Sequence, residues 1–310
     1  MLISTETSVY RLNSKNEKPK IILDNSDIRR VAEGKSRDFI AKGDGNIIID
    51  EGGSQETHLS GIQDRIDSLL ILEEKPFKLL IGCTPPNLYN FNEDGALAER
   101  NKSFDGLDVR SQWFTPWGGP PAVRSMVLTR DGWVYADIHV GSIMRSMDRG
   151  VNWEPVVPEL HRDVHEVKTS PTESSRVYAN TYLSVYVSYD RGNSWHHRSH
   201  ILENRYGRGI AVNPDDPDVM LCGVSDGPMG SNVHGQLHWT SNAGETWIHV
   251  KEGFPESTRE NIDTFHIAFQ DKNTAWATNE MNLFLSDDKG LTWKLFWTAP
   301  KEITMISCRS

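Results

Sequence analysis

The sequence has little cysteine and no long apolar run. Its three cysteines, Cys83, Cys222 and Cys308, lie in apolar, strand-like runs and form no close pair. This usage indicates reduced, buried thiols in an intracellular protein rather than a disulfide framework. No stretch long enough to span a bilayer is present, and Met1–Asn25 has no apolar signal-peptide core. We therefore expect a cytoplasmic protein with neither a membrane span nor a classical signal peptide.

Positive charge is also scarce. The chain has 33 Lys and Arg against 43 Asp and Glu, which gives a formal net charge of −10. Binding to nucleic acid or to an anionic membrane surface depends on clustered basic residues, so neither is expected as a general partner. The sequence also lacks a Gly-x-Ser-x-Gly elbow, a Walker loop and a His-Glu-x-x-His motif, so none of these catalytic signatures identifies a reaction.

Long stretches with helical periodicity are missing as well. Gly, Pro, Asn, Asp and Ser interrupt the chain about every ten residues, between short apolar alternating runs such as Val134–Ala136 and Val177–Ala179. This pattern is typical of an all-β protein.

The feature that is present is a repeat. Ser146, Asp148, Gly150 and Trp153 form a Ser-x-Asp-x-Gly-x-x-Trp pattern in a turn that follows a strand-like run. In such a turn the aspartate can accept backbone N–H groups, and the glycine can adopt a positive φ. Two further copies and one looser copy end at Trp195, Trp293 and Trp247, respectively. The tryptophans of successive copies are 42, 52 and 46 residues apart. Intervals of this size indicate a repeat architecture.

This repeat resembles the Asp-box, or BNR repeat, of sialidases, sortilin-type receptors, xyloglucan-active glycoside hydrolases and propeller-type photosystem II assembly factors. The resemblance implies a β-propeller in which the boxes are structural turns that lie away from the active site. It covers roughly residues 122–297 and is specific for architecture rather than for function.

We expect one seven-bladed propeller domain over residues 1–310, because seven units of about 44 residues would use the whole chain. Six blades are the alternative, since the second and third blades are weakly marked. The strand Ile303–Cys308 is expected to complete a blade with three N-terminal strands, which would close the propeller. Three segments exceed the needs of a blade and are candidate functional loops. They are Gly52–Asp67, Asn101–Pro121 and Gly227–His238.

The repeat also sets a register between blades. Aligning the blades by their strand-like runs places equivalent residues at the start of the innermost strands and in the loops of the same face. In propellers, small-molecule sites usually lie on that face, which is an argument by analogy. The residues that this register gathers are Arg124, His139, His165, Tyr182, Arg205, Arg208, Asp226, His266 and Glu280.

Three chemistries fit this set. His139, His165 and His266 could bind a divalent transition metal such as zinc or iron. One of these histidines, or Glu280, could act as a catalytic acid or base. The remaining residues would bind a small polar or anionic substrate, with arginine as the group that grips a carboxylate or phosphate. They are Arg124, Arg205, Arg208, Tyr182 and Asp226.

The favoured interpretation is a propeller enzyme of the hydrolase or lyase type, with a His- and Arg-lined site at the channel mouth. One alternative is a non-enzymatic scaffold that binds a protein partner through Trp113, Phe114 and Trp117, as photosystem assembly propellers do. A glycoside hydrolase with Asp137 paired to Glu280 or Asp226 is the other alternative. A sialidase is not expected, because the first blades contain no Arg-Ile-Pro motif.

Overall fold

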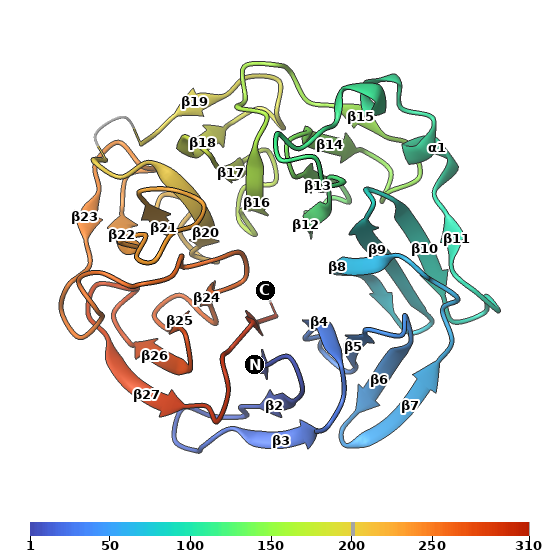
Figure 1. The fold of residues 1–310 in the computed structure, drawn as a ribbon, viewed down its shortest axis with the longest axis horizontal. Coiled ribbons are helices and arrows are strands. Elements are labelled where there is room, and N and C mark those ends of the chain that lie inside the picture. The colour runs from blue at the N-terminus through green and yellow to red at the C-terminus, as the bar shows by residue number, and fades with distance from the viewer. Residues whose placement is uncertain (200–201, 310) are drawn as a thin grey trace. The chain divides into compact units, whose positions relative to one another are not determined.

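The computed structural model describes residues 1–199 and 202–309. The chain folds into seven four-stranded antiparallel sheets, which are the blades of a seven-bladed β-propeller (Figure 1). The short helix α1 (Lys102–Asp105) and the 3₁₀ turn η1 (Asp108–Gln112) interrupt the strands between the third and fourth blades along the chain. The seven-bladed interpretation is therefore confirmed, and the six-bladed alternative is wrong.

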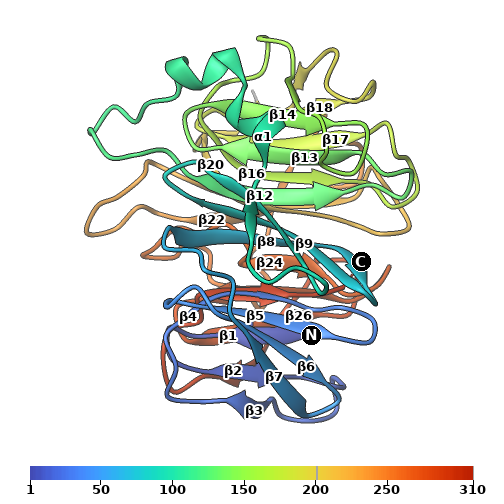
Figure 2. The ribbon, with the colours of Figure 1, turned by 90° about the vertical axis from the view of Figure 1, so that its right-hand side faces the viewer.

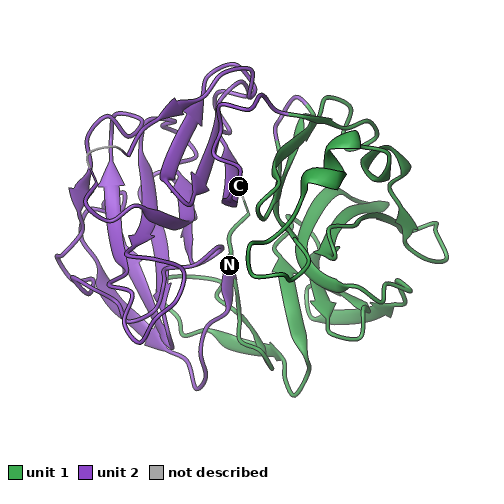
Figure 3. Cartoon of the chain, turned by 45° about the horizontal axis from the view of Figure 1, so that its top comes forward, with its two compact units in different colours: residues 1–128, 132–155, 307–309 green, residues 129–131, 156–306, 310 purple. Residues whose placement is uncertain are grey.

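The chain divides into two compact units, coloured separately in Figure 3. Unit 1 comprises residues 1–128, 132–155 and 307–309, and unit 2 comprises residues 129–131 and 156–306. The expectation of a single domain over residues 1–310 stays a prediction. Each unit is described by itself below.

Unit 1 contains three blades whose strands follow one another in the chain. Their innermost strands are β4 (Ile28–Ala32), β8 (Arg65–Glu74) and β12 (Val123–Leu128). The predicted connector Gly52–Asp67 is wrong as a simple loop, because its first half is the outer strand β7 and its end belongs to β8. The remaining strands are β5 (Asp38–Lys42), β6 (Ile47–Glu51), β7 (Ser54–His58), β9 (Phe77–Thr84), β10 (Leu88–Asn92), β11 (Glu99–Arg100), β13 (Val134–Ile138), β14 (Ser142–Ser146) and β15 (Glu154–Pro155).

Unit 2 contains three further blades of the same order. Their innermost strands are β16 (Val164–Thr169), β20 (Tyr206–Val212) and β24 (Ile267–Phe269). The remaining strands are β17 (Val177–Thr181), β18 (Ser184–Ser188), β19 (His196–His197), β21 (Met220–Ser225), β22 (Gln236–Thr240), β23 (Ile248–His249), β25 (Ala275–Asn279), β26 (Asn282–Ser286) and β27 (Lys294–Thr298).

The seventh sheet joins the two ends of the chain. Its strand order is β28-β1-β2-β3, where β28 is Met305–Ser307, β1 is Leu2–Ser4, β2 is Val9–Arg11 and β3 is Lys20–Leu23. The predicted blade of one C-terminal and three N-terminal strands is confirmed. Such a sheet gives the terminal strand β1 a hydrogen-bonded neighbour on each side, so its backbone groups are paired.

The aspartate of the Asp-box stabilises its own turn. Asp148 accepts hydrogen bonds from the Ser146 hydroxyl at 2.8 Å and from the backbone N–H groups of Val151 and Asn152 at 3.1 and 2.8 Å. Burial alone would raise the pKa of Asp148, but the bonds donated by Asn152, Ser146 and Val151 hold it below its ordinary value. The carboxylate is therefore engaged in its own turn, which fits a structural role.

The tryptophan of the box packs into the hydrophobic core of unit 1. The Trp153 indole N–H donates to the Gly150 carbonyl at 2.9 Å, and its ring meets Phe104 of α1 edge-on at 5.5 Å. The Trp153 backbone N–H also donates to the Ser103 hydroxyl. The helical segment drawn in Figure 2 is thus fixed to the turn after β14 of the same unit.

The structure bears on the expected state of the cysteines and on the expected lack of a membrane span. Cys83 and Cys222 are buried, Cys308 is half-buried, and all three are free thiols. Burial raises the pKa of both Cys83 and Cys222, so neither is an activated nucleophile. Within the described residues, no helix has the length and apolar character that crossing a membrane requires.

Candidate functional site

The innermost strands of unit 1 share a local irregularity. The pairing register shifts near the start of β4, β8 and β12, so that each strand carries an extra residue at that point. The extra residues are Arg29 in β4, Asp67 in β8 and Arg124 in β12. A β-bulge turns a side chain away from the regular alternation and is common beside functional sites. Three adjacent blades therefore present three charged residues at equivalent positions.

These bulges border a cavity of about 330 Å³ in unit 1. Four arginines and one aspartate supply the charges of its wall, which gives an excess of positive charge in a chain whose net charge is −10. The lining residues are Arg29, Arg30, Arg65, Ile66, Asp67, Ala122, Arg124 and His139.

Asp67 orders two of the four guanidinium groups. Its Oδ1 lies 3.0 Å from Arg65 Nη2 and 3.9 Å from Arg30 Nη2, while its backbone carbonyl accepts from Arg30 Nε at 2.5 Å. Asp67 Oδ2 accepts from the Thr84 hydroxyl. Arg30 also donates to the Arg29 carbonyl at 2.7 Å. One buried carboxylate thus positions two arginines that would otherwise repel each other.

His139 forms the wall of the cavity next to Ala122. It follows β13 directly, and its backbone N–H donates to the Ala122 carbonyl at 2.9 Å. The exposed Trp117 indole packs against the imidazole, with ring centroids 5.2 Å apart. The structure therefore brings Arg124 and His139, both candidates from the sequence, to one cavity.

The loop that carries Trp117 corrects one sequence expectation. Trp113 was expected to be exposed with Phe114 and Trp117, but only 9% of it is exposed, because it packs against Phe104 at 5.6 Å. Phe114 and Trp117 are exposed as expected, at 55% and 64%.

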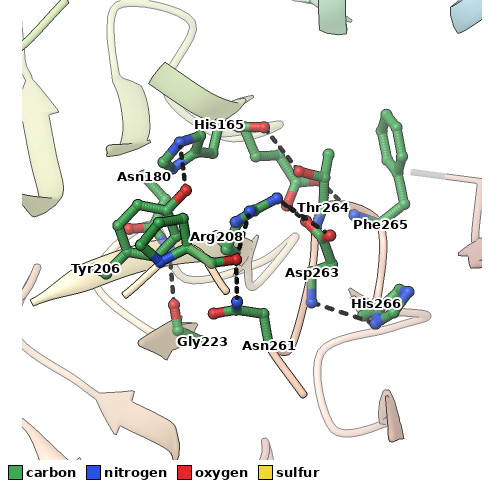
Figure 4. Close-up of polar contacts among 12 residues, drawn as sticks. His165, Asn180, Tyr206, Arg208, Gly223, Asn261, Asp263, Thr264, Phe265 and His266 are labelled. Carbon is green, nitrogen blue, oxygen red and sulfur yellow. Dashed lines mark hydrogen bonds and ion pairs between the residues drawn. The ribbon is translucent and has the colours of Figure 1, made fainter. Parts of the chain in front are cut away.

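Unit 2 repeats the bulge in two of its inner strands. In β16 the extra residue is His165, and in β20 the register shift falls at Arg208 and Gly209. His165 is fully buried, and its Nδ1 lies 2.5 Å from the Gly207 carbonyl. Because a carbonyl only accepts, this contact places a proton on Nδ1, while Nε2 lies 3.3 Å from the Tyr206 hydroxyl oxygen. Figure 4 shows this arrangement.

Two charged side chains flank the imidazole and the phenol in unit 2. Asp163 Oδ1 lies 3.3 Å from His165 Nε2. Arg208 Nη1 lies 3.2 Å from each oxygen of Asp263, and the guanidinium stands 5.2 Å from the Tyr206 ring centroid (Figure 4). His165 and Arg208, also candidates from the sequence, thus both contact Tyr206.

A buried glutamate fixes the loop beneath this group. Glu166 accepts from the Ile210 N–H at 2.8 Å and from the Phe265 N–H at 3.3 Å, and it pairs with Lys168 at 2.9 Å. Burial raises the pKa of Glu166, although Lys168 and the two N–H groups oppose the rise. The Thr264 hydroxyl donates to the His165 carbonyl at 2.8 Å, so the same loop is tied twice to β16.

His266 does not occupy a position equivalent to His165. It lies one residue before β24, a strand that has no register shift. Its Nδ1 accepts from the Asp263 N–H at 3.2 Å, and its Nε2 lies 3.2 Å from the Thr304 carbonyl. Both ring nitrogens thus serve local structure, and a metal ion would have to displace one of these contacts.

The other candidates in unit 2 lie toward solvent. Tyr182 is 49% exposed and stacks on His161 at 5.5 Å. Arg205 and Glu280 are exposed. Asp226 is about half-exposed and lies 2.7 Å from His234 Nδ1. Of the proposed metal ligands, His139 belongs to unit 1 and His165 and His266 belong to unit 2, so the three-histidine site stays a prediction.

The comparison with protein families places the chain among propellers. The sequence model of the sortilin (neurotensin receptor 3) family matches residues 141–276, which is less than half of the chain. A comparison of the sequence with curated proteins gave no match.

Solved structures extend the likeness to the fold of nearly the whole chain. A GH74 enzyme from Niastella koreensis is 14% identical with a TM-score of 0.73, over 96% of this chain and 52% of that one. The GH74 xyloglucanase from Xanthomonas campestris is 15% identical with a TM-score of 0.61, over 86% and 45%. YCF48 bound to the D1 peptide is 17% identical with a TM-score of 0.58, over 87% and 82%. The chain spans about half the length of these glycoside hydrolases, and the likeness at such low identity is one of fold.

Proposed function

Because the chain is a seven-bladed β-propeller of the BNR, sialidase-like type, we propose that it acts on a small anionic molecule held in the arginine-lined cavity of unit 1. The observation that carries the proposal is the convergence of four arginines on a cavity with one aspartate. His139, which lines the same cavity, is the group proposed to transfer a proton in a hydrolytic or lytic reaction. The fold alone does not separate enzymes from scaffolds, because its neighbours include both.

The charge balance of the cavity favours an anion. Among the lining residues four guanidinium groups face one carboxylate, and Asp27, which pairs with Arg29 at 3.3 Å, reduces the formal excess to two positive charges when His139 is counted as neutral. Asp67 orders Arg30 and Arg65, and its single negative charge does not balance both. A carboxylate or phosphate that accepts paired N–H bonds from a guanidinium would relieve this repulsion and match its planar geometry. The cavity volume is at the small end of the range for ligand pockets, which suits a small molecule.

The imidazole of His139 supports an acid–base role at this cavity. Histidine is the side chain whose ordinary pKa lies nearest neutrality, so it can both accept and return a proton at working pH. The hydrogen bond between the His139 N–H and the Ala122 carbonyl fixes the start of the loop that carries it. If His139, His165 and His266 bind a transition metal, elemental analysis of the purified protein would find it in stoichiometric amount.

A protein-binding scaffold is the second candidate, and one observation favours it. Phe114 and Trp117 expose 55% and 64% of their surface on one loop of unit 1. Exposed aromatic residues commonly anchor protein partners. The likeness to the structure of YCF48 bound to the D1 peptide covers 82% of that chain. This scaffold would bind a peptide without needing the arginines.

Calorimetric titration with inorganic phosphate and with acetate tests the anion proposal. We expect Arg124→Gln to weaken binding about 10- to 100-fold, since hydrogen bonds to charged groups contribute about 1.5–3 kcal/mol. Binding should also weaken as salt rises. The matched control is Arg130→Gln, which removes an exposed arginine outside the cavity and should bind like wild type.

Two outcomes would count against the proposal. One is that neither anion binds to the wild-type protein, and the other is that Arg124→Gln and Arg130→Gln weaken binding equally. In the first case, peptide binding that depends on Phe114 or Trp117 would favour the scaffold.

A further inference from the structure

The loop before β12 presents an indole to solvent at a tight turn. Within it, the Gly118 N–H donates to the Thr115 carbonyl at 3.0 Å, and Gly118 has a φ of +86° that a side chain would strain. The turn places Trp117 at its tip, where 64% of the residue is exposed. An exposed tryptophan costs solvation free energy, because its large apolar face stays in water.

Trp117 is not the residue that anchors this loop. Trp113 anchors it, because only 9% of this residue is exposed. Its ring packs against Phe104 and lies 5.0 Å from the Arg110 guanidinium. The turn itself is held by backbone and hydroxyl bonds that do not involve the indole, including the bond from Thr115 Oγ1 to the Gly119 carbonyl. The fold of the loop therefore gives no reason for an indole at position 117.

The position of the indole relative to the cavity gives such a reason. Trp117 packs against the imidazole of His139, with the rings tilted by 46° and their centroids 5.2 Å apart. The same imidazole lines the arginine cavity. Trp117 therefore lies next to the arginine cavity, in contact with one of its lining residues, His139.

We infer that the anion bound in this cavity carries an aromatic ring, which stacks on Trp117 while its anionic group pairs with the arginines. This inference rests on the proposed function and names the class of its ligand as aromatic carboxylates or phosphates. The ring covers the apolar face of the indole, and the edge-on or offset geometry that aromatic pairs prefer adds to the gain from burial. A simple anion of the same charge would use only the inner, cationic part.

Three carboxylates of equal charge separate the two contributions. Acetate carries only the anionic group, cyclohexanecarboxylate adds an apolar ring, and benzoate adds an aromatic one. With the wild-type protein, we expect benzoate to bind about 3- to 10-fold more tightly than cyclohexanecarboxylate, and both to bind more tightly than acetate. Trp117→Ala should remove the advantage of benzoate, whereas Trp117→Phe should keep part of it.

Phe114→Ala is the matched control, because Phe114 is an exposed aromatic residue of the same loop. It should leave the benzoate preference unchanged. Thermal unfolding of each variant checks that the loop change leaves the fold intact.

The outcomes distinguish the inference from the function on which it rests. If acetate binds in an Arg124-dependent manner but benzoate and cyclohexanecarboxylate bind equally, or if Trp117→Ala leaves the benzoate preference intact, the aromatic ligand class is wrong and the anion site stands. If none of the three carboxylates binds to the wild-type protein, both proposals are wrong.

Discussion

Replacing Glu166 with alanine is expected to lower the free energy of unfolding by about 3–5 kcal/mol, as removal of one partner from a buried ion pair does. Glu166 is fully buried and is the acceptor for the Ile210 and Phe265 N–H groups as well as the partner of Lys168. Alanine would leave these donors without the carboxylate that pairs them. Urea unfolding at neutral pH measures the loss.

The Glu166→Gln variant separates charge from hydrogen bonding. Glutamine keeps the size of the side chain and one carbonyl acceptor, so one of the two N–H groups stays paired while the ion pair with Lys168 is lost. We expect a smaller loss than for alanine. A loss below about 1 kcal/mol for Glu166→Ala would contradict the role assigned to this carboxylate in holding the loop of Asp263 and His266.

Acidification is expected to cost stability through His238. Burial, together with the neighbouring His249 stacked on it at 4.9 Å, lowers the pKa of His238 to about 4. In the unfolded chain a histidine has a pKa of about 6.5, so the unfolded state binds more protons than the folded state between these values. Stability from this group is therefore present above pH 6.5 and is lost as the pH falls toward 4. The expected loss is about 3 kcal/mol, at about 1.4 kcal/mol per pKa unit.

His238→Phe is the control for this pH dependence. Phenylalanine keeps a ring that can stack on His249 but cannot titrate. The difference in unfolding free energy between pH 7 and pH 4 should be about 3 kcal/mol smaller in this variant than in wild type. The Asp-box carboxylates titrate alike in both proteins, so their contribution cancels. Equal pH dependence in the two proteins would show that His238 is not held neutral by burial.

The fold was predictable because its signals are local. Each Asp-box combines a turn aspartate, a positive-φ glycine and a packing tryptophan within eight residues, and the interval between boxes sets the blade length. The strand-like runs Val134–Ala136 and Val177–Ala179 therefore lie within the observed strands β13 and β17. The sheet of β28 with β1, β2 and β3 followed from the need to pair a lone terminal strand.

The candidate site was only partly predictable because two of the three blades that line it are weakly marked in the sequence. Arg29 and Asp67 were missed because their blades, the second and third, are weakly marked, whereas Arg124, which also lies at a bulge, was found in a better-marked blade. The remaining signal in the sequence is a charged residue at the start of a strand-like run, as in Ile28-Arg29-Arg30 and Ile66-Asp67-Ser68.

Burial of single aromatic residues was also beyond the sequence. Trp113 and Trp117 occur in one Gly- and Pro-rich segment with no periodicity, so nothing local distinguishes them. The 3₁₀ turn η1 directs Trp113 toward Phe104, while the turn at Gly118 leaves Trp117 outside. That difference depends on tertiary packing, which decides which of two similar residues joins the core.

A crystal structure with bound selenate tests the central claim most directly, because the anomalous signal of selenium locates the anion without ambiguity. The cavity account predicts a peak enclosed by Arg29, Arg30, Arg65 and Arg124, within hydrogen-bonding distance of at least two guanidinium groups. The peak should disappear in Arg124→Gln crystals grown under the same conditions. Selenate found only elsewhere on the protein, with the cavity unoccupied, would contradict the account.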